Sequence, residues 1–211
     1  MGRTSDADER LMTAAHDLMW EESYGSVTID DICKRADVKK GSFYYFFASK
    51  AALMVAALEK MWIEDWKPSL DARFSPSLAP LARITSFLES CYTSQCAVQK
   101  QTGKVLGCPV CSVGSEVSTQ EVDVGAKVRE IVARKQRYLE SAIRDAVAEG
   151  AIEPCDPAQK AVALSCMMEG AISKARIMND PEPLRNLLSM GMDLLRPKAG
   201  AASTSVPVGV K

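Results

Sequence analysis

The chain has 211 residues, of which 47% are hydrophobic and 25% are charged, and its formal net charge is −1. A nearly neutral chain is not expected to coat nucleic acid indiscriminately, and no apolar run approaches the roughly 18 residues of a membrane span. The polar start, MGRTSDADER, lacks the apolar core of a secretory signal, so we expect a cytoplasmic protein without membrane attachment.

The first predicted helix runs from Asp6 to about Glu22. Its apolar residues, among them Leu11 and Leu18, recur at the spacing of a helix that faces a core. Gly25 is expected to end this helix, because glycine is favoured just beyond a helix C-terminus.

Two short helices are predicted next, over about residues 28–47. Thr28 is followed three positions later by Asp31, a pattern close to a capping box at a helix start. Asp37 can take the left-handed conformation of a turn between the helices. Residues 39–45 place small and basic side chains first and aromatic side chains last, which suits a helix whose N-terminal end enters a DNA major groove. The segment therefore predicts a DNA-binding helix-turn-helix.

A spaced set of residues makes this segment more specific, namely Thr28, Ala36, Gly41, Tyr44, Phe47 and Lys50. In this spacing, residues 6–58 resemble the N-terminal domain of the TetR family of bacterial repressors. Asp37 stands where the family usually has Gly, Phe46 where it usually has His, and Ala48 where it often has Pro. The resemblance implies an all-α protein, with a three-helix DNA-binding domain followed by a helical domain for effector binding and dimerisation.

Contacts with DNA are expected from two groups of residues. The predicted base contacts come from Lys39, Lys40, Gly41 and Ser42. Gly41 belongs there because a bare backbone can approach a partner closely. The predicted phosphate contacts, which position the protein without specifying sequence, come from Thr28, Tyr44, Tyr45 and Lys50. A small basic patch on a neutral body favours a homodimer that reads a palindromic operator.

A fourth helix is predicted from Ser49, as its N-cap, to about Trp66, with Pro68 closing it. The Ser- and Pro-rich residues 75–80 indicate a loop and a domain boundary. We therefore expect a helix-turn-helix domain over residues 6–66 and an effector-binding and dimerisation domain over residues 78–196.

The second domain is predicted to be helical throughout. Its expected helices cover about residues 81–99, 107–118, 122–149, 156–178 and 183–196. The last two are apolar on more than one side, which favours pairing with a second subunit over completing a monomer core. Residues 197–211 lack apolar periodicity and are predicted to be disordered.

The most distinctive cysteines lie in the sequence Gly107-Cys108-Pro109-Val110-Cys111, in a chain with seven cysteines. Pro109 suits the first position of a helix, which would make Cys108 the N-cap and Cys111 the third helical residue. Thiols at a helix N-terminus tend to be reactive, so this pair could sense oxidants or electrophiles and close a disulfide. The alternative is that both cysteines only pack between helices. A zinc site is less favoured, and no metal or cofactor is expected.

A reversible small-molecule effector is the alternative to thiol sensing, and it would bind an apolar pocket in the second domain. Candidate lining residues are Phe87, Cys91, Tyr92, Val110, Tyr138, Met167, Met168 and Ile172. No nucleophile and base can be paired around the only histidine, so an enzyme is not expected. The sequence predicts a DNA-binding regulator, a repressor released by a small molecule or an electrophile. The other class left open is a thiol-redox or metal-binding protein with a degenerate helix-turn-helix.

Overall fold

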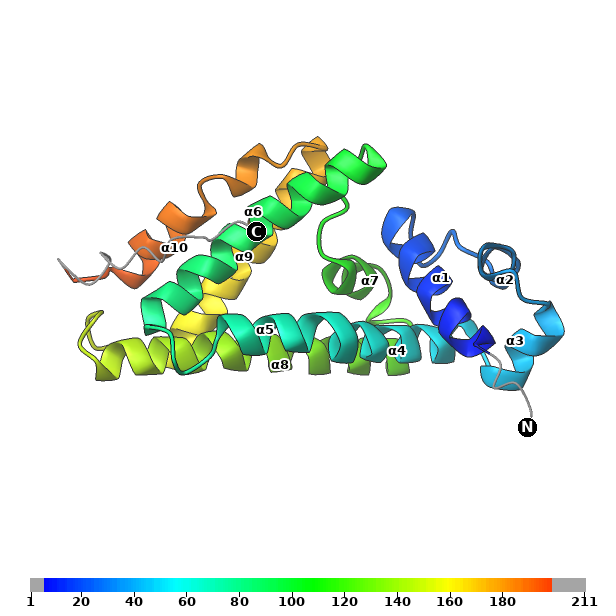
Figure 1. Ribbon diagram of the computed structural model, residues 1–211, viewed down its shortest axis with the longest axis horizontal. Coiled ribbons are helices and arrows are strands. Elements are labelled where there is room, and N and C mark those ends of the chain that lie inside the picture. The colour runs from blue at the N-terminus through cyan, green and yellow to red at the C-terminus, as the bar shows by residue number, and fades with distance from the viewer. Residues whose placement is uncertain (1–5, 199–211) are drawn as a thin grey trace. The chain divides into compact units, whose positions relative to one another are not determined.

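The computed structural model describes residues 6–198, and the regular elements within them are helices (Figure 1). In chain order they are α1 (Ala7–Glu21), α2 (Ile29–Ala36), α3 (Lys40–Phe46), α4 (Lys50–Met61), a π-helical turn (Trp62–Trp66), α5 (Lys67–Arg73), α6 (Pro80–Thr102), α7 (Pro109–Val117), α8 (Val122–Ala148), α9 (Pro157–Met178), a 3₁₀ turn (Glu182–Leu184) and α10 (Leu187–Leu195). The predicted all-α fold is confirmed.

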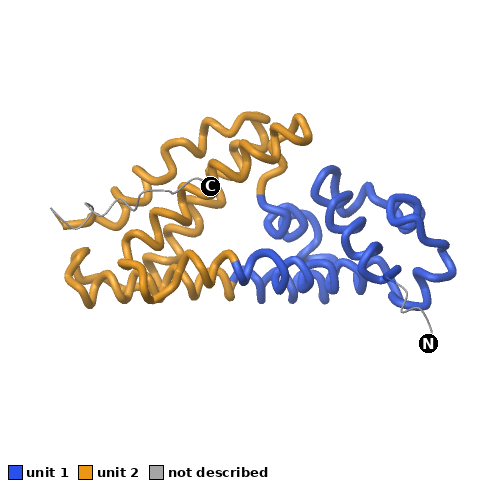
Figure 2. The backbone as a smooth tube through the Cα atoms, in the orientation of Figure 1, with its two compact units in different colours: residues 1–68, 108–132 blue, residues 69–107, 133–211 orange. Residues whose placement is uncertain are grey.

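The chain forms two compact units (Figure 2). The first contains the residues up to Pro68 together with Cys108–Val132, and the second contains Ser69–Gly107 and the residues from Ala133 onward. The first unit thus takes α7 and the beginning of α8 together with the N-terminal helices, although these segments are distant in sequence.

The first unit is organised around α1, which packs against α2, α4 and α7. Leu11 and Leu18 of α1 are buried in its core, as their spacing predicted. Lys127 of α8 adds an ion pair with Glu59 of α4, at 3.0 Å between Nζ and Oε2. The prediction that Gly25 ends α1 is wrong, because the helix already ends at Glu21.

The fourth helix begins where it was predicted, but the helical path ends later than predicted. The Ser49 side chain accepts a hydrogen bond from the Ala52 N–H at 3.0 Å, which confirms Ser49 as the N-cap. The helical path then continues past Pro68 to Arg73, so the prediction that Pro68 closes it is wrong. A π-helical turn immediately before Pro68 already interrupts the regular hydrogen-bond ladder, so the missing N–H of proline is tolerated there.

In the second unit, α10 packs against both α6 and α9. Arg83 of α6 is buried and donates to the Leu78 and Pro76 carbonyls, at 2.7 and 3.2 Å, and to the Asp145 carboxylate of α8 at 2.7 Å. This hydrogen bonding satisfies a guanidinium that would otherwise be costly to bury.

The C-terminal end differs from the prediction in one respect. The single helix expected over 183–196 is divided, because a 3₁₀ turn closes with Arg185 donating to the Glu182 carbonyl before α10 begins. Pro197 forms an isolated antiparallel bridge with Ile152. The predicted disordered tail otherwise lies outside the described residues.

Within residues 6–198, no single helix has the length and apolar composition to cross a membrane. One bent pair, α3 with the continuous helical stretch Lys50–Arg73, passes on length and composition alone.

Candidate nucleic-acid interface

The start of α2 is fixed by a reciprocal pair of hydrogen bonds. The Thr28 hydroxyl accepts from the Asp31 N–H at 3.2 Å, and the Asp31 carboxylate accepts from the Thr28 N–H at 2.9 Å. This arrangement is a capping box, as the sequence indicated. The Thr28 hydroxyl, and next its N–H, stabilise the ionised carboxylate and lower the pKa of Asp31 from its usual 3.8.

The turn after α2 has the predicted left-handed residue, Asp37, with φ of 51°. The Val38 N–H donates to the Cys33 carbonyl at 2.9 Å across this turn. Sequence reasoning missed a further contact, in which the Arg10 guanidinium of α1 donates to the Ala36 carbonyl at 3.0 Å and to the Asp37 carbonyl at 3.3 Å. The turn between α2 and α3 is therefore stabilised by hydrogen bonds from its own backbone and from the Arg10 side chain of α1.

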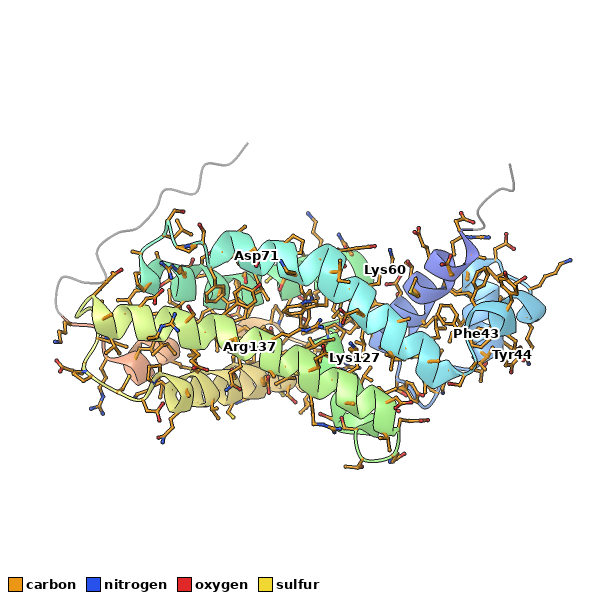
Figure 3. The ribbon with its side chains drawn as sticks, turned by 90° about the horizontal axis from the view of Figure 1, so that it is seen from below. Phe43, Tyr44, Lys60, Asp71, Lys127 and Arg137 are labelled. Atoms are coloured by element: carbon orange, nitrogen blue, oxygen red, sulfur yellow. The ribbon has the colours of Figure 1, made fainter. Side chains whose placement is uncertain are left out.

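Helix α3 buries one aromatic ring and exposes two. Phe43 is fully buried, whereas Tyr44 is 54% and Tyr45 83% exposed. Figure 3 labels Phe43 and Tyr44 on this helix. Apart from its chain neighbours and the backbone of α3, no atom of residues 6–198 lies within 4 Å of the position that a Cβ on Gly41 would occupy. The exposed face of α3 thus combines tyrosines with an open backbone position, which suits contact with a large polar partner.

The basic residues at the start of α3 lie at the surface. Lys39 is exposed and is the N-cap residue, and Ser42 is half-buried. The Lys40 ammonium pairs with the Asp30 carboxylate of α2 at 2.8 Å, an interaction that raises the pKa of Lys40. Both side chains of this pair are exposed, so a phosphate or a base could replace Asp30 as the partner of Lys40.

Lys50, a predicted phosphate contact, is engaged within the protein. Its Nζ donates to the carbonyls of Tyr24 and Val27, at 2.8 and 3.0 Å, and lies 4.3 Å from the centre of the Tyr24 ring. The ammonium therefore stabilises the loop between α1 and α2, a role that the sequence spacing did not indicate.

Glu116 of α7 binds the backbone N–H groups of the same loop. The Glu116 carboxylate accepts from the Tyr24 N–H at 2.9 Å and from the Gly25 N–H at 2.6 Å. Burial, followed by the nearby carboxylates Glu121 and Glu116, raises the pKa of Tyr24 to about 12. Sequence reasoning missed Glu116, and the one local signal was the glycine at position 25.

The two cysteines singled out in the sequence lie where they were predicted. Cys108 is the N-cap of α7 and Pro109 its first residue, so Cys111 occupies the third helical position. Cys108 is buried, and Cys111 is half-buried. No group of three or more metal-ligating side chains gathers in the part of the chain that the structure describes.

Among the predicted effector-pocket residues, Tyr138 lines a cavity of the second unit, and a pocket lined by the others stays a prediction. This cavity of about 290 Å³ is also lined by Phe74, Arg83, Arg137, Ser141 and Ala142. Burial, followed by a hydrogen bond to Asp71, raises the pKa of Tyr138 to about 12.

The remaining predicted pocket residues differ in how far they are exposed to solvent. Phe87, Val110 and Met168 are buried, whereas Cys91, Tyr92, Met167 and Ile172 are half-buried. Val110 also belongs to the first unit, unlike the others.

Comparison with known proteins gives two family matches that together span most of the chain. Residues 11–57 match the family described as "Bacterial regulatory proteins, tetR family". Residues 80–190 match the one described as "Tetracyclin repressor-like, C-terminal domain".

Individual relatives agree with these matches. The transcriptional regulator AcuR of Cereibacter sphaeroides is 32% identical over 182 residues, covering 85% of this chain and 81% of that protein. The HTH-type transcriptional repressor NemR of Escherichia coli is 26% identical over 189 residues, covering 87% and 91%. A crystal structure of regulatory protein TetR from Rhodobacter sphaeroides superposes with a TM-score of 0.80 at 31% identity, covering 90% of this chain and 99% of that one.

Proposed function

The chain belongs to the TetR family of bacterial transcriptional regulators, and from this premise we propose that it is a homodimeric repressor that binds a palindromic operator. As a member of this family it is a DNA-binding transcriptional regulator, and we expect it to act by binding DNA rather than by catalysis. Its relative NemR is named a repressor, which supports repression over activation. The protein would act on DNA in the cytoplasm.

The observation that carries this proposal is the exposed face of α3, which follows a helix α2 whose two ends are stabilised by a capping box and a left-handed turn. Base contacts are assigned to Lys39, Lys40, Gly41 and Ser42. Phosphate contacts are assigned to Thr28, Tyr44 and Tyr45, with Lys50 contributing while it stabilises the loop. Because the capping box and the left-handed turn are intact, a degenerate helix-turn-helix in a redox or metal-binding protein is disfavoured.

Dimerisation is supported by apolar side chains that the single chain leaves exposed on α9 and α10. They are Val162, Ile177, Met178 and Met190. Large apolar side chains left exposed on neighbouring helices are common at protein interfaces. A second subunit on this surface would also supply the second reading helix, which a palindromic operator requires about one helical turn away.

Release from the operator is assigned to the second half of the chain, with the cysteine pair at the start of α7 as the leading candidate. A hydroperoxide would oxidise one thiol of Cys108 and Cys111 to a sulfenic acid, with an alcohol or water leaving. The other thiol would then displace water and close a disulfide. An intrahelical bridge at the first turn would distort α7. The alternative effector is a small molecule in the second unit, where the cavity beside Tyr138 offers space.

The test is a titration of a fluorescent duplex from the region upstream of the gene. Wild type, Cys108→Ser and Cys166→Ser are compared, each reduced and then treated with a mild hydroperoxide. Cys166 lies exposed on α9, so Cys166→Ser controls for oxidation elsewhere. We expect tight binding that oxidation abolishes in wild type and Cys166→Ser but not in Cys108→Ser. If oxidation did not change the affinity of any of the three proteins, the cysteine pair would have only a packing role. A small apolar molecule would then be the remaining candidate effector.

A further inference from the structure

We propose that Glu116 is a positioning residue for operator binding, because its carboxylate ties α7 to the loop that leads into α2. The proposal rests on the proposed function, since it concerns how the reading helix is held for DNA. We call the loop residues Tyr24–Val27, with Glu116 and Lys50 bound to them, the loop clasp.

The clasp begins with two adjacent N–H groups that converge on one carboxylate. Glu116 accepts from Tyr24 at 2.9 Å and from Gly25 at 2.6 Å. Hydrogen bonds to an ionised acceptor are roughly twice as strong as those between neutral groups. Glu116 is 92 residues from Tyr24 in sequence, so this contact fixes a long-range relation between helices rather than a local turn.

The carbonyl groups of the same loop are bound by a cation. Lys50 of α4 donates to the carbonyls of Tyr24 and Val27. An acid thus binds the loop's N–H groups while an ammonium binds its carbonyls. Val27 directly precedes Thr28, the N-cap of α2, so the clasp determines where α2 begins relative to α4 and α7.

Gly25 provides a separate observation for the same contact. Its φ is not among the positive values of the chain, so the turn itself does not require glycine. A Cβ at this position would lie 2.8 Å from the Glu116 Oε1 atom. The absence of a side chain therefore serves the close approach of the carboxylate.

Because the clasp is exposed to solvent, its effect on the position of α2 and α3 can be distinguished from its effect on the stability of the fold. Glu116 and Gly25 are both at the surface, so water could satisfy the Gly25 N–H if the carboxylate were absent. Little stability should then be lost. What would be lost is the directional link between α7 and the helix-turn-helix, and with it the preferred placement of α3.

The clasp also offers a path from the cysteine pair to DNA within one compact unit. Glu116 lies near the end of α7, and Cys108 and Cys111 lie at its beginning. Helix α7 is closely packed on α8, since a Cβ on Gly114 would lie 2.7 Å from a Val128 methyl group. A distortion at the first turn of α7 would therefore move the helix and Glu116 with it.

The experiment compares wild type with Glu116→Gln, and uses Glu121→Gln as the matched control. Glu121 is also a carboxylate beside Tyr24, but it accepts from the side-chain hydroxyl and not from the backbone. Each protein is titrated at fixed salt with the operator and with a duplex in which one base pair is inserted between the half-sites. Thermal unfolding and amide hydrogen exchange are measured in parallel.

We expect Glu116→Gln to weaken operator binding by about fivefold, because one charge-assisted acceptor is lost. The preference for the natural spacing over the inserted one should shrink, and the amides of Tyr24 and Gly25 should exchange faster. Glu121→Gln should match wild type in affinity and spacing preference. Unchanged affinity and spacing preference in Glu116→Gln, despite faster exchange, would overturn the proposal.

A second variant covers the case in which Glu116→Gln folds poorly. Gly25→Ala keeps the Glu116 charge but pushes the carboxylate from its place, so it should reduce affinity and spacing preference in the same direction. Wild-type affinity and spacing preference in Gly25→Ala would overturn the proposal. If wild type itself did not distinguish the operator from a scrambled duplex, the proposed function would fail and this proposal with it. That outcome differs from the failure of Glu116 alone, in which wild type binds specifically.

Discussion

The two helices of the helix-turn-helix are nearly equal in length but are held in very different ways. Helix α2 has a capping box at its start, a left-handed residue at its end and Ile32, Cys33 and Ala36 in the core. Helix α3 has no side-chain cap, and Phe43 is its one buried residue. The two exposed tyrosines and the basic start of α3 face outward.

This difference separates positioning from reading. Side chains that hydrogen-bond the backbone of α2 are not available to recognise bases. Within residues 6–198, the exposed side chains of α3 make no such backbone contacts, so they can differ between operators. Substitutions in α2 should therefore act mainly on stability, and those on the outer face of α3 mainly on DNA binding.

The largest effect is expected at Phe43, the one buried residue of α3. Phe43→Ala should lower the free energy of unfolding by about 3–5 kcal/mol, because it removes a fully buried ring. Chemical denaturation followed by circular dichroism measures this change. Tyr45→Ala, which removes a ring of similar size from the surface, is the control and should leave stability nearly unchanged. Equal losses of unfolding free energy in Phe43→Ala and Tyr45→Ala would contradict the separation between a buried and an exposed face of α3.

A smaller loss is expected at the start of α2. Thr28→Val removes the cap hydroxyl at nearly constant volume and should lower stability by about 1 kcal/mol near neutral pH. Chemical denaturation at several pH values measures this loss.

The capping box also predicts the pH dependence of that loss. Asp31 has a lowered pKa in the folded protein, so its contribution is present above its usual value of 3.8 and is lost as pH falls through the lowered one. Wild type should therefore lose more stability on acidification than Thr28→Val. Parallel pH profiles of the two proteins would argue against this role of Asp31.

On the outer face of α3 the effects should fall on DNA alone. Tyr45→Phe should weaken binding to all operator variants by about fivefold, because one phosphate hydrogen bond is lost without any loss of base recognition. Ser42→Ala should instead change the ranking of operator variants. Titrations against a panel of duplexes at fixed salt separate these results. Full wild-type affinity for every duplex in Tyr45→Phe would remove Tyr45 from the phosphate contacts.

The smallest effect is expected where the two helices meet. Asp30→Asn frees Lys40 from its ion pair and removes a negative charge facing DNA, so operator affinity should rise by about twofold at low salt. The gain should shrink as salt is added. Lys40→Met provides the matched test, because Asp30→Asn in that background should lose most of its gain. A gain that persisted without Lys40 would show that the ion pair is not its cause.

The local parts of this site were predictable because their causes lie a few residues apart. Thr28 with Asp31, Asp37 in the turn, Ser49 as a cap and Cys108 before Pro109 are each determined by neighbours in sequence. The all-α class followed from apolar spacing in the same way.

The parts that sequence reasoning missed depend on distant residues. Gly25 looked like a helix terminator, but its role depends on a carboxylate that is 91 residues away. Lys50 has the spacing of a phosphate contact, while its ammonium lies on carbonyls of an earlier loop. Pro68 was expected to end a helix because the π-helical turn before it has no sequence signature of its own.

The proposed function depends on specific recognition of an operator through α3. It is tested most directly by titrating the protein with a duplex from its own upstream region and with a scrambled duplex of the same composition, at one salt concentration near physiological. We expect the upstream duplex to bind tighter by about 10³-fold or more, and Lys39→Ala with Ser42→Ala to remove most of this preference. Equal affinity of the wild type for both duplexes, lowered alike by added salt, would contradict the proposed function.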